Sequence, residues 1–283
     1  MNTPRTYPEG VSCWIDIEVA DVEAAAKFYA VLFGWTYVEA TAPGSRLRYL
    51  IAQLDGQDVA GIGQLSATDD FPNHPATWNT YVAVEDVDEA AARVEAAGGR
   101  VTEAPSDVAE AGRTASCVDT EDIGFRLWQP RSRLGAQLTN VPGTWNFSDL
   151  YTADPGASVA FYSRVFGWQF DDLGFATVIR QPGYGDHLAA TSDPDIFQRQ
   201  SGDQVPPGFA DAIGWLVLLP DGEQQPHWHV TFTVGDRDES AATAEHLDAF
   251  VLSSNDTMWT RDAQIRDPQR AVFSVSQYTP PSG

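Results

Sequence analysis

The residues of this chain most able to do chemistry are a few histidines and aspartates in its C-terminal half. Three of the five histidines, His187, His227 and His229, fall close together in the sequence. In a strand, the spacing His227-x-His229 places both imidazoles on one side, where they can bind a metal ion. His187 can transfer protons near neutral pH with Asp186 or Asp149 as an orienting partner, although a solvent-facing loop histidine is the commoner case. These side chains favour metal binding or acid–base catalysis.

The elements that must position these side chains repeat along the chain. Three pairs of segments match each other: 14–35 with 147–168, 79–84 with 229–234, and 119–129 with 267–277. Self-similarity of this kind indicates a duplicated structure. We therefore predict two homologous domains, at residues 10–130 and 143–279, the second with an insertion at about 184–225.

Each half divides again, because an alternating strand followed by a helix with an aspartate at its start occurs four times. The aspartates that can accept hydrogen bonds from backbone N–H groups at the helix starts are Asp21, Asp86, Asp154 and Asp236. Short β-rich runs follow each helix. The predicted unit is βαβββ, present four times in an α+β chain.

Strand alternation predicts which side chains share a face of a sheet. Asp16 and Asp149 occupy the same repeat position, where a face covered by apolar packing would carry Val, Ile or Leu. The residues predicted on the same faces are Trp14, Glu18, Asn79 and Tyr81 in the first half, and Phe147, Tyr151, His229 and Thr231 in the second. The two aspartates are either structural, bonded to backbone or arginine, or part of a polar, aromatic-walled cup for a small organic ligand.

The insertion at about 184–225 makes the second half longer than the first. Long loops in compact domains are often functional. The aromatic residues Tyr184, Phe197, Phe209 and Trp215 argue against disorder. The insertion is predicted either to form a lid or to bury the interface between the halves.

The composition excludes several kinds of partner. Asp and Glu number 40 against 17 Lys and Arg, so the formal net charge is −23 and most of the surface repels nucleic acids and anionic bilayers. No apolar stretch approaches the length of a membrane span and the N-terminus lacks an apolar signal core, so we expect a cytoplasmic protein. Cys13 and Cys117 lack C-x-x-C spacing and are expected to be reduced, buried thiols.

Three motifs carry a family resemblance: F-Y-x-x-x-F-G-W at 28–35 and 161–168, D-V-A-G-I-G at 58–63, and terminal strands ending at Gln129 and Gln277. On these motifs nearly the whole chain resembles the vicinal oxygen chelate superfamily of glyoxalases, bleomycin-resistance proteins and extradiol dioxygenases, and within it the two-domain actinobacterial members. The resemblance implies two tandem glyoxalase-like domains, in which four βαβββ modules form curved mixed sheets enclosing open cups. It also implies that a cup holds the ligand, often over a divalent metal.

The positions that the resemblance implies for metal ligands hold mostly side chains that cannot coordinate a metal. The first-strand ligand falls on Trp14 and Phe147, the fifth-strand ligand on Asn79 and His229, and the last-strand glutamate on Arg126 and Ser274. Only His229 keeps a metal-competent type, so we expect no cofactor. The alternative is a divalent metal held by His229 with Asp16, Glu18 or Asp149.

Two classes of function follow from these observations. One is a metal-free protein that binds a small organic ligand through Trp14, Asp16, Glu18, Asn79, Tyr81, Arg126, Phe147, Tyr151, Thr231 and Ser274. The other is a glyoxalase-like lyase, isomerase or dioxygenase that uses His229, His187 and Asp149. A bare scaffold is a third possibility. The fused halves imply a monomer with an intramolecular pseudo-dimer, or a homodimer, whose partner is a small molecule.

Overall fold

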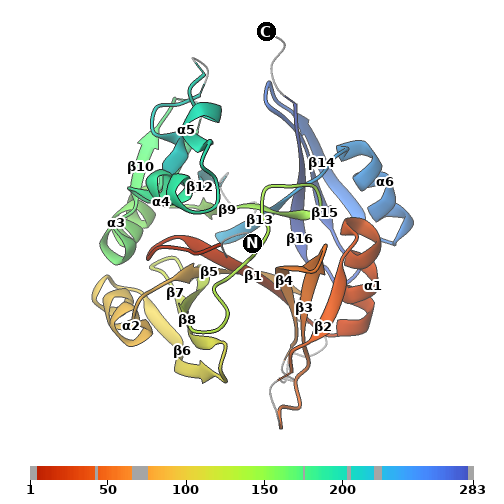
Figure 1. The fold of residues 1–283 in the computed structure, drawn as a ribbon, viewed down its shortest axis with the longest axis horizontal. Coiled ribbons are helices and arrows are strands. Elements are labelled where there is room, and N and C mark those ends of the chain that lie inside the picture. The colour runs from red at the N-terminus through yellow and green to blue at the C-terminus, as the bar shows by residue number, and fades with distance from the viewer. Residues whose placement is uncertain are drawn as a thin grey trace. The chain divides into compact units, whose positions relative to one another are not determined.

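The computed structural model describes residues 5–41, 44–65, 76–174, 176–202, 205–219 and 225–279 (Figure 1). The first module consists of β1 (Ser12–Val19), α1 (Val22–Phe33), β2 (Thr36–Glu39), β3 (Tyr49–Leu54) and β4 (Gln57–Gln64). The second module consists of β5 (Thr77–Ala83), α2 (Val87–Ala96), β6 (Arg100–Val108), β7 (Gly112–Val118) and β8 (Gly124–Pro130).

The second half repeats this order with additional helices. Its third module consists of β9 (Thr144–Thr152), α3 (Pro155–Phe166), β10 (Gln169–Asp172), β11 (Thr177–Arg180) and β12 (Ala212–Leu218). Between β11 and β12 lie α4 (Tyr184–Ala190), α5 (Ile196–Arg199) and the 3₁₀ turn η1 (Phe209–Asp211). The fourth module consists of β13 (His227–Thr233), α6 (Arg237–His246), β14 (Phe250–Asp256), β15 (Thr260–Arg266) and β16 (Val272–Tyr278). The predicted fourfold βαβββ repeat is confirmed.

The strands form two mixed sheets of eight strands each, one from each half. Their orders are β2-β3-β4-β1-β5-β8-β7-β6 and β10-β11-β12-β9-β13-β16-β15-β14. Within them β1 is parallel to β4 and β5 to β8, whereas the hairpin strands are antiparallel. Sheet hydrogen bonding is therefore completed within each half.

Packing groups the modules differently from the sheets. One compact unit comprises residues 1–14, 80–135 and 148–228, which we call unit one, and the other comprises 15–79, 136–147 and 229–283, which we call unit two. Unit one therefore contains the second module's helix α2 and the third module's α3, and these two helices contact each other (Figure 1). Unit two likewise contains α1 and α6 in contact.

The F-Y-x-x-x-F-G-W motif supplies the aromatic core of each unit. Tyr29 stacks on Trp35 with ring centroids 5.6 Å apart, and Tyr162 stacks on Trp168 at 5.0 Å. The glycine of each motif adopts a positive φ, 76° at Gly34 and 74° at Gly167, so each helix ends in the left-handed conformation that glycine accommodates without strain. The motif thus both terminates a helix and fills a core.

A buried tyrosine–aspartate pair, which we call a clasp, occurs once in each unit. In unit two Tyr29 donates from Oη to Asp267 Oδ2 at 2.8 Å, and in unit one Tyr162 donates to Asp119 Oδ2 at 3.0 Å. The other oxygen of each aspartate accepts two backbone N–H groups of its own turn. Burial raises the pKa of both aspartates and of both tyrosines. Each clasp ties a motif helix to a turn of the module packed against it.

All four predicted aspartate caps are confirmed. Asp21 accepts from the N–H of Ala24, Asp154 from that of Ala157, and Asp86 and Asp236 each accept two N–H groups in the first helical turn. Each cap satisfies backbone donors that a helix leaves without an internal partner. Pro155 occupies the first turn of α3, where its missing N–H costs nothing.

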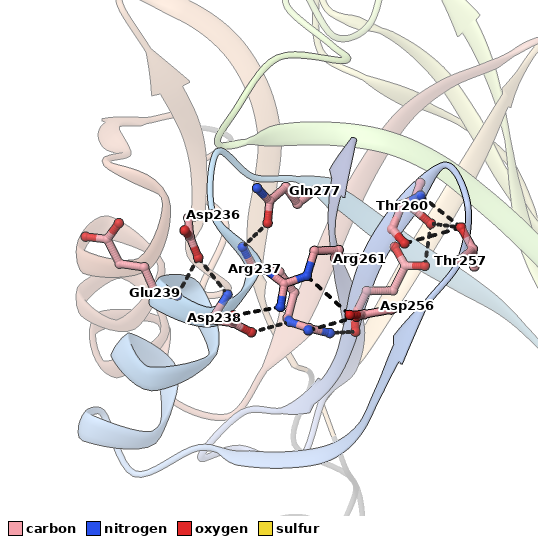
Figure 2. Close-up of polar contacts among 10 residues, drawn as sticks. Asp236, Arg237, Asp238, Glu239, Asp256, Thr257, Thr260, Arg261 and Gln277 are labelled. Atoms are coloured by element: carbon pink, nitrogen blue, oxygen red, sulfur yellow. Dashed lines mark hydrogen bonds and ion pairs between the residues drawn. The ribbon is translucent and has the colours of Figure 1, made fainter. Parts of the chain in front are cut away.

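A network of charges holds the start of α6 to β14 and β15 (Figure 2). Arg237, 5% exposed, donates to Asp238 at 2.6 Å, to Asp256 at 2.9 Å and to the Asp262 carbonyl at 2.6 Å. Arg261 donates to Asp238 at 2.8 Å. In the first half Arg113 pairs with Asp88 as Arg261 does with Asp238, but a buried Val87 stands in place of Arg237.

Both cysteines are free and buried, as predicted. Burial raises the pKa of Cys13 and raises that of Cys117 to about 12, so neither forms a thiolate near neutral pH. No helix in the described part of the chain has the length and apolarity that crossing a bilayer requires.

Candidate functional site

The first strand of the chain, β1, presents one apolar and one mixed face. In β1, Ile15 and Ile17 are fully buried, whereas Trp14 and Glu18 on the other face are half-buried. Asp16 lies on that second face and is only 1% exposed. The face therefore carries a polar group that is almost fully removed from water.

Asp16, Tyr49 and Asn79 form a hydrogen-bonded group in unit two, which we call the Asp16 cluster. Asn79 Nδ2 donates to Asp16 Oδ1 at 2.8 Å, and Tyr49 Oη donates to Asp16 Oδ2 at 3.0 Å. Both carboxylate oxygens therefore have a side-chain donor. Buried carboxylates require such donors. The hydrogen bonds of the cluster therefore support a structural role for Asp16.

Tyr49 reaches Asp16 because β4 has glycines at the two positions, Gly61 and Gly63, that the Tyr49 ring crosses. A Cβ on Gly61 would lie 2.1 Å from Tyr49 Oη, and one on Gly63 would lie 3.3 Å from the Tyr49 ring. The D-V-A-G-I-G motif therefore leaves space for an aromatic ring laid against the strand. The sequence reasoning missed Tyr49, and the two alternate glycines of β4 are the signal that could have found it.

Arg126 on β8 lies beside Tyr81 on β5 in unit one. Its Nη1 donates to Tyr81 Oη at 2.7 Å, and its guanidinium carbon lies 5.4 Å from the centre of the Tyr81 ring. Trp14 packs, partly buried, against the small cluster that contains Tyr81 and Trp128. This first-half region combines a cation with aromatic surface.

A chain of contacts along neighbouring strands links four aromatic residues to Asp149 in unit one, and we call this group the Asp149 face. Its members are Asp149 and Tyr151 on β9, His227 on β13, Trp215 on β12 and Phe209 in η1. Tyr151 and His227 stack with ring centroids 5.0 Å apart and an interplanar angle of 21°, and Phe209 lies 5.7 Å from Trp215. The backbone N–H of Trp215 donates to Asp149 Oδ1 at 3.0 Å.

The members of the Asp149 face are half-buried, so they are shielded yet reachable. Burial lowers the pKa of His227, and a hydrogen bond to the Gln225 carbonyl opposes that shift. His227 is therefore a neutral aromatic ring at pH 7, and Asp149 is the ionisable carboxyl of the group. The arrangement suits a flat, apolar or cationic molecule.

The insertion contributes directly to this face. Residues 212–218 of the predicted segment form the sheet strand β12, and the part without a first-half counterpart runs from 181 to 211. Phe209 comes from this inserted part, and Trp215 comes from β12, the strand that directly follows it. The sequence reasoning counted both among its aromatics but did not connect them with Asp149.

His229 and Ser274 form a pair in unit two. His229 Nε2 lies 2.8 Å from Ser274 Oγ, and His229 is 1% exposed. Thr231, two residues along β13, is the register partner of Ser274 on β16 and is half-buried. Phe147, on β9, is also half-buried.

His187 bonds to the N-terminal segment. Its Nε2 lies 3.0 Å from both the hydroxyl and the carbonyl oxygen of Thr6, and its ring faces Tyr184, which in turn accepts from Arg5. These contacts fasten α4 to residues 5 and 6. They give His187 a packing role that needs no proton transfer.

Comparison with known proteins places this fold and these residues in a family. A family model described as "Glyoxalase/Bleomycin resistance protein/Dioxygenase superfamily" matches residues 14–127, and one described as "Glyoxalase-like domain" matches 146–276. The chain belongs to this superfamily. Within the superfamily it is 32% identical over 278 residues to "Putative glyoxylase CFP32" of Mycobacterium bovis, covering 97% of each chain. It is also 32% identical to "Anthracycline biosynthesis protein DnrV" of Streptomyces peucetius, covering 95% of this chain and 94% of that one.

Solved structures share the superfamily fold at low sequence identity. The Mn(II)-bound glyoxalase from Novosphingobium aromaticivorans has a TM-score of 0.59 at 14% identity, with 96% of this chain and 85% of that chain covered. The 2,3-dioxygenase LapB from a Pseudomonas species has a TM-score of 0.59 at 13% identity, with 96% and 95% covered. These likenesses concern the fold.

The residues present do not fit the metal site that the superfamily resemblance implies. Trp14 and Phe147 have no donor atom that binds a metal, and Arg126 brings a positive charge. The Asn79 amide donates to Asp16, and His229 Nε2 faces Ser274. Across the described ranges no three His, Cys, Asp or Glu side chains come together as a metal ion requires.

Proposed function

We propose that this superfamily member binds a small, planar, aromatic organic molecule on the Asp149 face, without the help of a metal. The observation that carries the proposal is the set of two half-buried ring pairs, Tyr151–His227 and Phe209–Trp215, linked to one carboxyl group through β9 and the Trp215 backbone. Aromatic pairs and cations over aromatic faces are each worth about 1 kcal/mol. A ligand that stacks on these rings and carries a positive charge would gain both kinds of contact.

Two further observations support this ligand class. The net charge of −23 attracts cationic molecules at long range. A relative that is 32% identical is named for anthracycline biosynthesis. As a chemical class, anthracyclines have a planar polycyclic ring system that carries an amino sugar. We therefore propose a ligand with a flat polycyclic ring system and a cationic substituent.

A fluorescence titration with the anthracycline daunorubicin tests the proposal. We expect saturable binding that persists in 0.5 M salt (on the order of a 4 Å Debye length), because stacking is not screened as general charge attraction is. Tyr151→Leu should weaken binding roughly three- to tenfold, the loss of about 1 kcal/mol of ring contact. The matched control is Tyr278→Leu, at a tyrosine 62% exposed on β16, which should bind as the unchanged protein does. Binding that vanishes in salt, or that Tyr151→Leu leaves intact, would refute the proposal.

A metal-dependent enzyme is the second candidate, since the structural likeness extends to a Mn(II)-bound glyoxalase and His229 keeps a ligand-type side chain. Elemental analysis of the untagged protein and of His229→Ala separates the two. We expect no stoichiometric divalent metal in either protein. About one equivalent that disappears in His229→Ala would favour the enzyme and a search among chelatable substrates.

A further inference from the structure

The His229–Ser274 pair joins a serine hydroxyl to a buried imidazole on two adjacent strands. His229 Nε2 and Ser274 Oγ are 2.8 Å apart, and β13 and β16 run parallel with Thr231 in register with Ser274. Both residues stand on sheet strands, which position side chains more rigidly than loops do. The pair is therefore a fixed feature of the fourth module.

Exposure differs between the two partners. His229 is 1% exposed, whereas Ser274 is half-buried on its strand. The imidazole is thus sheltered from water while the hydroxyl remains reachable by a molecule at the sheet face. A sheltered base behind an accessible hydroxyl is the arrangement by which serine becomes nucleophilic.

We propose that Ser274 is a nucleophile for acyl transfer from small esters and that His229 is its general base. The chemistry needs a hydroxyl and an imidazole within about 2.6–3.2 Å. This inference goes beyond ligand binding on the Asp149 face and does not depend on it.

The reaction is balanced without any cofactor. Ser274 Oγ bonds to the ester carbonyl carbon as its proton passes to His229 Nε2, and the ester C–O bond breaks as that proton passes to the departing alcohol oxygen. Water then adds to the acyl carbon, giving its proton to His229, and the carboxylic acid leaves as the Ser274 hydroxyl is restored. In each stage His229 Nε2 first accepts a proton and then donates it.

The first half lacks this pair. Asn79 and Arg126 stand at the repeat positions of His229 and Ser274, and they bond to Asp16 and Tyr81 instead. Neither side chain is a nucleophile at neutral pH. The proposed activity is therefore confined to the second half, and one acyl group per chain is the expected stoichiometry.

The test uses p-nitrophenyl acetate as substrate and phenylmethylsulfonyl fluoride as a label, on the full chain. We expect p-nitrophenol release above background and a single sulfonylated residue, Ser274, by peptide mass mapping. Ser274→Ala should abolish both signals, and His229→Gln should lower them about a hundredfold, the scale of lost general-base catalysis. Ser276→Ala, on the same strand face but 6% exposed and without a histidine contact, is the matched control and should keep the full rate.

A cysteine substitution keeps the proposal testable if His229→Gln fails to fold. In Ser274→Cys the new thiol would face the same imidazole, which favours the thiolate. We expect iodoacetamide at pH 6.5 to alkylate this thiol about tenfold faster than free cysteine. Alkylation no faster than free cysteine, or ester cleavage and labelling that survive Ser274→Ala, would overturn the proposal.

Discussion

Asp16 and Asp149 occupy the same position in the two halves but have different surroundings. Asp16 is 1% exposed and has a side-chain donor on each oxygen, from Asn79 and Tyr49. Asp149 is half-buried beside aromatic rings and accepts the backbone N–H of Trp215. The same repeat position therefore holds an enclosed acceptor in one half and a half-buried carboxyl group in the other.

The two tyrosine–aspartate clasps, in contrast, have not diverged between the units. Tyr29–Asp267 and Tyr162–Asp119 keep the same donor, the same acceptor and nearly the same distance in the two units. The parts of the repeat that did not diverge are therefore those that hold helix to turn in the core. The compared residues that diverged lie on the mixed faces of the sheets, where we propose that the ligand binds.

The largest expected effect comes from removing a clasp. Asp267→Ala leaves Tyr29 Oη and two backbone N–H groups without their buried acceptor, which should cost about 3 kcal/mol of unfolding free energy. Asp119→Ala should cost the same, because its contacts match. Urea unfolding measures both, with exposed Glu245→Ala as a control that changes stability by less than about 0.5 kcal/mol. Markedly unequal losses would show that the clasps have diverged after all.

The second-largest expected effect comes from displacing Tyr49, which bonds to Asp16. Gly61→Ala places a Cβ within 2.1 Å of Tyr49 Oη and 2.9 Å of Asp16 Cβ, so the ring must move and its hydrogen bond is lost. We expect a loss of about 2 kcal/mol in the same urea experiment. Gly124→Ala, where an added Cβ meets nothing within 4 Å, should change stability little. Equal stability of the two variants would contradict the packing of Tyr49 against β4.

A smaller effect should separate the two aspartates directly. Asp16→Asn turns an amide N–H₂ toward a donor and should cost about 1.5 kcal/mol, whereas Asp149→Asn keeps an oxygen for the Trp215 N–H and should cost less than about 0.5 kcal/mol. Thermal denaturation measures this difference. Daunorubicin affinity should change in the other order, falling for Asp149→Asn only. A large stability loss without any change in binding would make Asp149 structural as well.

The smallest effect concerns pH. Burial raises the pKa of Asp119 and Asp267, so the folded protein holds their protons more tightly than the unfolded chain does. The stability that they contribute is complete below the unfolded value of about 3.9 and is lost as the pH rises through the raised folded pKa. The stability of the unchanged protein relative to Asp267→Asn should therefore be lower at pH 7 than at pH 4. A difference that stays constant, or that grows with pH, would show that folding does not raise the pKa of Asp267.

Much of the architecture was predictable from the chain itself. The four aspartate caps and the glycines after the motif helices act within one helical turn, so their spacing determines their role. The alternation along β1 likewise predicted that Asp16 lies opposite Ile15 and Ile17. Local periodicity and a duplicated sequence were sufficient for the βαβββ repeat.

The candidate sites were predictable only in part, because their chemistry depends on which distant residues meet. His227 was linked to His229 by strand spacing, but its ring stacks on Tyr151, and Trp215 reaches Asp149 from a segment more than fifty positions away. His187 was a candidate proton carrier, yet it bonds to Thr6 near the other end of the chain. No periodicity in the sequence encodes such pairings.

By itself the sequence determined the duplication, the element order and the capping of the helices, because each depends on residue type and short spacing. Only the tertiary structure decided that one aspartate is enclosed and its repeat partner is reachable, that a serine faces a buried histidine, and that packing groups modules from different halves. These outcomes depend on contacts between residues far apart in the chain, and the free energy that selects them is that of burial and hydrogen bonding in the folded core.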